Sequence, residues 1–138
     1  MTSLKADDTK RVFVATVAGI VAKLRVLELS DPNGVFTESL RMLDRDASDY
    51  VKTRWASRGH AATVKQAVET LTEEVRGLIQ DAMLARINHP LLGRLIVACV
   101  EAVETDVIVD PRQREFFEEA RGRLGRGNAE AAERGDDE

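Results

Sequence analysis

The sequence predicts an all-α fold, a compact bundle of about five helices over residues 1–124 with a disordered acidic tail over residues 125–138. Three observations predict it. A heptad pattern runs through the middle of the chain, and other segments carry apolar residues at helical spacing between turn signals. Aromatic residues make up only 4% of the sequence. A core of Val, Leu, Ile and Ala suits closely packed helices better than a cofactor pocket.

The heptad pattern belongs to a helix expected over residues 61–87. Its seam residues are alternately four and three positions apart, which places them along one side of a helix. Gly77 interrupts this helix at a cost of about 1 kcal/mol relative to Ala, and we interpret it as the mark of a close helix crossing. Other helices, from this chain or another, must cover the apolar face. The seam consists of Val64, Val68, Leu71, Val75, Leu78, Ala82 and Ala85.

The first helix is expected to begin at Asp8 or Thr9 and to end before the turn-forming residues 30–34. It is apolar on nearly all sides between residues 12 and 22, so it must be covered from more than one direction. Gly19, which has small neighbours, would let another helix approach closely. This helix is either the centre of a monomeric bundle or part of an oligomer interface. The candidate interface residues are Val14, Ala18 and Val26.

Three further helices are expected, over residues 37–57, 90–105 and 111–124. For the second helix of the chain, Thr37 is the expected N-cap and Phe36 the hydrophobic staple. For the last helix, Asp110 is the expected N-cap, with Gln113 in the capping-box position. The β-branched residues 107–109, which precede that cap, are expected to be extended.

Charge and cysteine content limit the class of protein. The net charge is −4, most of it from the tail, so the helical body is nearly neutral and the charge favours no particular partner. The single cysteine, Cys99, excludes an intramolecular disulfide and a thiolate zinc site, and we expect it to be a buried structural thiol. This cysteine usage is typical of a cytoplasmic protein. The apolar run over residues 12–22 is too short to span a bilayer, so no membrane association is expected.

No motif predicts catalysis. The chain has no Gly-rich phosphate loop, and the two histidines, His60 and His89, lie at a helix break and in a turn. Neither has the carboxylate spacing that helical di-iron sites use. We therefore expect no enzyme activity, no cofactor and no metal. The glutamates of the helices expected over residues 61–87 and 90–105 are interpreted as parts of solvated helix faces: Glu69, Glu73, Glu74, Glu101 and Glu104.

One polar segment stands out, because residues 50–65 contain four basic residues and no acidic one. Aromatic rings are interleaved with these cations. Guanidinium groups for phosphate and flat rings for stacking are what contacts with RNA or single-stranded DNA require. The alternatives are that Trp55 belongs to the core, or that the cations face an acidic protein partner. The candidate contact residues are Lys52, Arg54, Trp55, Arg58, His60 and Lys65.

Two functional hypotheses follow from these patterns. The first is a non-catalytic helical interaction module that associates with itself or serves as a small subunit of a larger assembly. It predicts that charging an apolar surface position of the first helix, such as Val14 or Val26, abolishes assembly. The second is a nucleic-acid-associated helical subunit that contacts a phosphate backbone through residues 52–65 and therefore binds in a salt-dependent manner.

Overall fold

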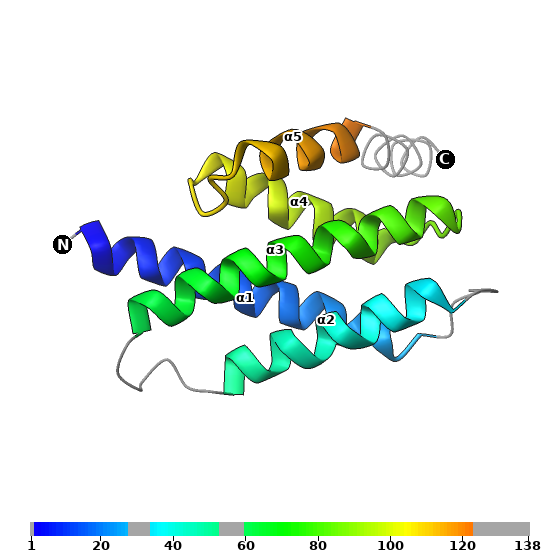
Figure 1. The fold of residues 1–138 in the computed structure, drawn as a ribbon, viewed down its shortest axis with the longest axis horizontal. Coiled ribbons are helices and arrows are strands. Elements are labelled where there is room, and N and C mark those ends of the chain that lie inside the picture. Colours follow the sequence, from blue (N-terminus) through cyan, green and yellow to red (C-terminus); the bar gives the residue numbers. More distant parts are fainter. Residues whose placement is uncertain (1, 28–33, 53–59, 123–138) are drawn as a thin grey trace, which may run out of the picture.

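The computed structural model describes residues 2–27, 34–52 and 60–122, and every regular element within these ranges is a helix. The five α-helices are α1 (Thr2–Arg25), α2 (Val35–Lys52), α3 (His60–Leu84), α4 (Pro90–Glu104) and α5 (Pro111–Ala120). Successive helices run in opposite directions (Figure 1). The predicted all-α bundle is confirmed. The tail predicted over residues 125–138 lies outside the described residues.

Helices α1 and α3 form the middle of the arrangement, since α1 contacts α2, α3 and α4, and α3 contacts all four other helices. Helix α2 lies on one side of the pair formed by α1 and α3, and α4 and α5 lie on the other (Figure 1). Helix α1 begins at Thr2, six residues before the predicted start at Asp8. Leu4, Lys5 and Ala6 are good helix formers, and they extend the helix because elongation is far easier than nucleation.

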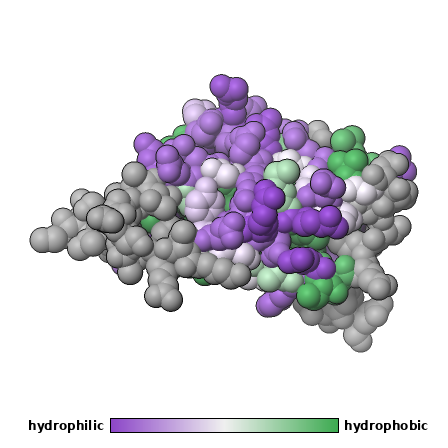
Figure 2. Space-filling view, turned by 60° about the horizontal axis from the view of Figure 1, so that its bottom comes forward, coloured by the Kyte–Doolittle hydropathy of each residue, from purple (hydrophilic) through white to green (hydrophobic). Residues whose placement is uncertain are grey.

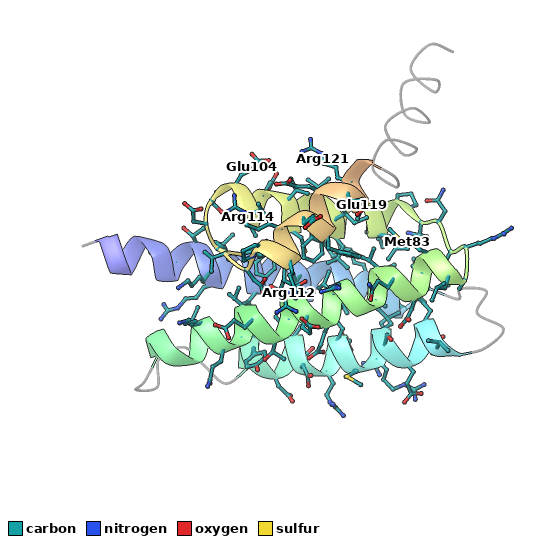
Figure 3. All side chains as sticks on the ribbon, turned by 45° about the horizontal axis from the view of Figure 1, so that its top comes forward. Met83, Glu104, Arg112, Arg114, Glu119 and Arg121 are labelled. Atoms are coloured by element: carbon teal, nitrogen blue, oxygen red, sulfur yellow. The ribbon has the colours of Figure 1, made fainter. Side chains whose placement is uncertain are left out.

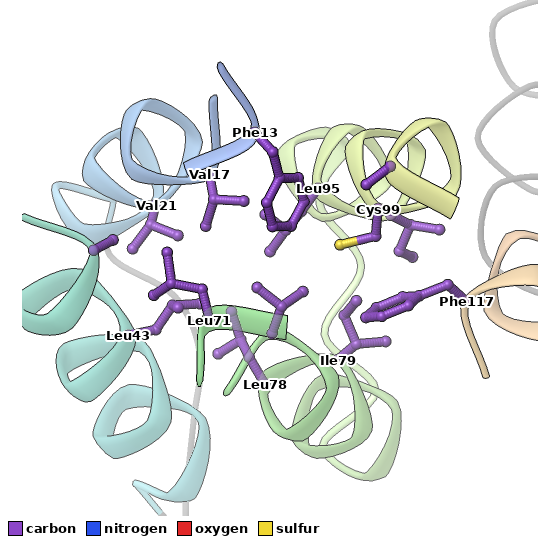
Figure 4. Packing of buried hydrophobic residues seen from close by; sticks show 14 of the residues in the cluster. Phe13, Val17, Val21, Leu43, Leu71, Leu78, Ile79, Leu95, Cys99 and Phe117 are labelled. Atoms are coloured by element: carbon purple, nitrogen blue, oxygen red, sulfur yellow. The ribbon is translucent and has the colours of Figure 1, made fainter. Parts of the chain in front are cut away.

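The buried side chains form one cluster to which all five helices contribute. Val17 and Val21 of α1, Leu71 of α3 and Leu95 of α4 meet in the interior, and Phe117 closes it from α5 (Figure 4). Six of the seven predicted seam residues are buried. The seventh, Ala85, lies just beyond the end of α3. The heptad pattern is thus satisfied within one chain.

Helices α3 and α4 end in the same way, with a non-glycine residue in the left-handed region. Arg86 has φ 57° and Asp106 has φ 61°. After α3, the N–H groups of Arg86 and Ile87 donate to Met83 and Ala82; the corresponding bonds follow α4. This is the Schellman pattern of paired reverse bonds. It explains why α3 ends at Leu84 rather than at the predicted residue 87.

The N-termini of α4 and α5 are capped by side chains. His89 accepts at Nδ1 from the N–H of Leu91, and Asp110 accepts from the N–H of Arg112, as predicted for Asp110. The predicted capping box is wrong, because the amide of Gln113 donates to Glu73 of α3 instead. The segment over residues 107–109 is not helical, in agreement with the prediction.

Helix α2 begins at Val35, so the prediction of Thr37 as its N-cap is wrong. Gly34, at φ 71°, turns the chain into the helix, and its carbonyl accepts from the N–H of Glu38. Phe36 therefore lies in the first helical turn, where it is fully buried. In the part of the chain that the structure describes, no helix is both long and apolar enough to cross a bilayer.

Candidate interaction surfaces

One long side of α1 is exposed, although α2, α3 and α4 cover the rest of the helix. Exposed residues recur every three or four positions from Val12 to Val26, which spans about 21 Å along the helix axis. Five of these seven residues are Val, Ala or Gly, and the two valines are 63% and 81% exposed. The α1 stripe, as we call this surface, consists of Val12, Ala15, Thr16, Gly19, Ala22, Lys23 and Val26.

Gly19 lies at the middle of the α1 stripe. A Cβ atom added there would meet nothing within 4 Å, so no described part of the chain approaches this glycine. The same holds for Gly77, and the predicted close helix crossing at Gly77 is not found within the described chain. A glycine inside a helix costs about 1 kcal/mol relative to Ala. Intramolecular packing therefore gives no reason for either glycine.

The three predicted interface residues have different environments. Val14 is fully buried in the bundle core, so its prediction as a surface position is wrong. Its side of α1 faces the other helices of the same chain. Ala18 is partly buried and packs against the core. Val26 follows α1 directly and is 81% exposed, so it is available to a partner.

The predicted basic segment is described only at its edges. Lys52 ends α2 and His60 begins α3. Arg54, Trp55 and Arg58 lie outside the described residues. Lys65 is exposed on α3, and it lines a cleft together with five acidic residues. That acidic surrounding disfavours a phosphate backbone at Lys65.

The acidic cleft, as we call it, lies between α3 and the connection from α4 to α5, with Lys10 of α1 and Gln113 of α5 completing its lining. Its volume is about 940 Å³. Val68 of α3 and the connection residues Val107 and Ile108 are buried residues of the lining. The acidic residues of the lining, of which the three glutamates were interpreted from sequence as solvated and Asp110 as a helix cap, are Glu69, Glu73, Glu74, Asp106 and Asp110.

Two residues that line the acidic cleft each have a buried oxygen atom without a hydrogen-bond partner. Gln113 is only 6% exposed; its Nε2 donates to Glu73, while its Oε1 is buried and has no hydrogen-bond partner. Oε2 of Glu74 is likewise buried and unpartnered. The site forms because the α4–α5 connection places Val107 and Ile108 in one cleft with residues of α3. Sequence patterns missed it because no local motif predicts that arrangement.

Burial raises the pKa of Glu74 to about 8. A hydrogen bond and charge repulsion from Asp46 on α2 act in the same direction, and Arg45 opposes them. Glu74 therefore holds a proton at neutral pH and shares it with a neighbouring carboxylate, which allows two acidic groups to lie together between α2 and α3. Cys99 is fully buried, and burial raises the pKa of its thiol, so it is an unreactive core residue as predicted.

The face of the molecule shown in Figure 2 is mainly hydrophilic. Figure 2 shows polar side chains over most of one face, with small hydrophobic groups chiefly toward one end. On the α4–α5 side, Nη1 of Arg121 lies 3.9 Å from Oε1 of Glu104, and both side chains are exposed (Figure 3). Within the described ranges, no group of three His, Cys, Asp or Glu residues is placed to hold a metal ion. Comparison of the chain with models of protein families, with curated proteins and with solved structures finds no match.

Proposed function

We propose that this protein is a non-catalytic helical interaction module that associates with a second copy of itself through the α1 stripe. The observation that carries the proposal is that α1, which three other helices contact, keeps one continuous exposed side made mainly of small and apolar residues. A side of this kind lets a second helix approach closely. The chain's own helices already cover the other sides of α1.

The pattern of the α1 stripe favours a second copy as the partner. Seven residues before Gly19 stands Val12, and seven residues after it stands Val26. Three residues to either side stand Thr16 and Ala22. Two α1 helices packed antiparallel about a two-fold axis at Gly19 would therefore place Val12 of one copy against Val26 of the other. Such self-complementarity is what an isologous interface requires.

Introducing a charge into the α1 stripe tests this function. Ala22 is exposed in the single chain, so Ala22→Glu leaves the bundle intact but buries a carboxylate in the proposed interface. We expect light scattering after size exclusion to show a dimer for the natural chain and a monomer for this variant. Val97→Glu on the exposed side of α4 is the matched control and should stay dimeric. An unchanged mass for Ala22→Glu contradicts the proposal.

Contact with single-stranded nucleic acid is a second candidate. It is supported by one arrangement, because Lys52 at the end of α2 and His60 at the start of α3 lie at the same end of the bundle (Figure 1). The double change Arg54→Glu and Arg58→Glu should then abolish binding to a single-stranded oligonucleotide, and binding by the natural chain should weaken with salt. Binding that survives the double change contradicts this candidate.

A further inference from the structure

The acidic cleft has two rows of carboxylates that face a common space. Glu69 and Glu73 lie one helical turn apart on α3 and form one row. Asp106 and Asp110, at the two ends of the α4–α5 connection, form the other. All four residues are exposed. A ligand in this cleft would therefore meet negative charge at several points along its length.

Apolar residues also contribute to the lining of the cleft. Val68, Val107 and Ile108 are buried residues that contribute to it. A hydrated metal ion gains nothing from such a lining, whereas a hydrocarbon chain loses its contact with water against it. The cleft thus offers a ligand both apolar and anionic contacts.

One buried side chain beside the cleft lacks a hydrogen-bond donor rather than an acceptor. Gln113 is only 6% exposed, and its carbonyl oxygen Oε1 has no hydrogen-bond partner. Because buried polar groups in proteins are nearly always hydrogen-bonded, this atom indicates a missing N–H or O–H group. A ligand rich in N–H donors supplies it.

We propose that the acidic cleft binds a linear alkyl polyamine, whose ammonium groups pair with the carboxylates while its methylene segments lie against Val68, Val107 and Ile108. A polyamine matches each of the three features at once: repeated positive charges, hydrocarbon between them, and an excess of N–H donors. This site is separate from the α1 stripe, so the proposal does not depend on self-association.

Two lysines reduce the negative charge of the cleft. Lys65 stands one turn before Glu69 on α3, and Lys10 lines the cleft from α1. Each repels a bound ammonium group. Neutralising Lys65 should therefore strengthen polyamine binding, which is an effect that damage to the fold would not produce.

The test is a titration of the full chain with spermidine at low salt, followed by isothermal calorimetry and by amide NMR shifts. We expect saturable one-to-one binding, with the largest shifts at Val68, Val107 and Ile108. Glu73→Gln should weaken binding about tenfold, because it removes a charge-assisted contact. Lys65→Gln should strengthen it about threefold. Glu118→Gln, an exposed change on α5 outside the cleft, is the matched control and should bind as the natural chain does.

Three outcomes would overturn the proposal. One is the absence of saturable binding by the natural chain. Another is equal weakening by Glu73→Gln and Glu118→Gln, which would mean that spermidine responds only to net charge. The third is tighter binding of a lysine-rich peptide than of spermidine, which would make the cleft a site for a basic protein partner.

Discussion

Arg25, the last residue of α1, donates a hydrogen bond from Nη1 to Oδ2 of Asp44 on α2 over 2.6 Å. The carboxylate is 8% exposed and the arginine side chain 61% exposed. The pair fixes the end of α1 against α2, beside the last residue of the α1 stripe. The asymmetry in burial means that the two partners are not equivalent for stability, because a buried charge without its partner is costly.

We predict that Arg25→Met lowers the free energy of unfolding by about 1–2 kcal/mol, since it leaves the carboxylate of Asp44 buried without its guanidinium. Adding Asp44→Leu to that variant should recover most of the loss. Urea unfolding of the single and double variants forms a double-mutant cycle that measures the coupling. Strictly additive losses would show that the two side chains do not interact.

The helix ends after α3 and α4 lead to a second prediction. Arg86→Gly should raise the free energy of unfolding by up to about 1 kcal/mol, because glycine adopts a positive φ without steric cost. Asp106→Gly should raise the free energy of unfolding by less, since Asp tolerates the left-handed region better than Arg does. Thermal unfolding monitored by circular dichroism measures both. Arg94→Gly, inside α4, should lower the free energy of unfolding. A similar loss for Arg86→Gly would contradict the interpretation of these helix ends as Schellman motifs.

Glu74 makes stability depend on pH. Its pKa of about 8 in the folded chain lies above the ordinary value of 4.5, so the folded state binds the proton more tightly than the unfolded state does. The contribution is complete below the ordinary pKa and is lost as the pH rises through the folded-state pKa. Glu74→Gln mimics the protonated form, and we expect its urea midpoint to fall less than that of the natural chain between about pH 5 and about pH 9.

The control for that series is Glu69→Gln, an exposed residue of the same helix, which should keep the pH dependence of the natural chain. If Glu74→Gln and the natural chain lose stability in parallel as the pH rises, the protonated carboxyl between α2 and α3 does not exist.

The glycines within helices α1 and α3, Gly19 and Gly77, allow the effect of a substitution on stability to be separated from its effect on self-association. Gly19→Ala and Gly77→Ala should each raise the free energy of unfolding of the monomer by about 0.5–1 kcal/mol, because neither new Cβ atom meets a neighbour. Only Gly19→Ala should weaken self-association, since its Cβ atom would stand where the second α1 is proposed to pack. Sedimentation at several protein concentrations tests this difference. Equal association of both variants would count against a contact at Gly19.

Helical periodicity predicted most of the fold. The seam from Val64 to Ala82 is buried as its spacing requires, and Asp110 with Pro111 marked the start of α5 correctly. The ends were harder to predict. Arg86 terminates α3 from a left-handed conformation that sequence assigns to glycine, and Gly34 rather than Thr37 sets the start of α2. These positions depend on backbone geometry that neighbouring residue types do not specify.

The candidate surfaces were predictable only in part. Apolar residues on all sides of the first helix indicated that it needed several partners, but not which side the chain itself would cover. Val14 and Val26 are alike as residues, yet one is in the core and the other is exposed. The acidic cleft could not be predicted at all, because it requires the α4–α5 connection to fold against α3, which only tertiary packing decides.

The most direct measurement of the central claim is the molar mass of the natural chain by sedimentation equilibrium over a wide concentration range. Self-association through α1 predicts a mass of two 15.3 kDa chains at high concentration that falls toward one chain on dilution. It also predicts that Ala22→Glu shows the mass of one chain throughout. A natural chain that stays at 15.3 kDa at every concentration would contradict the account.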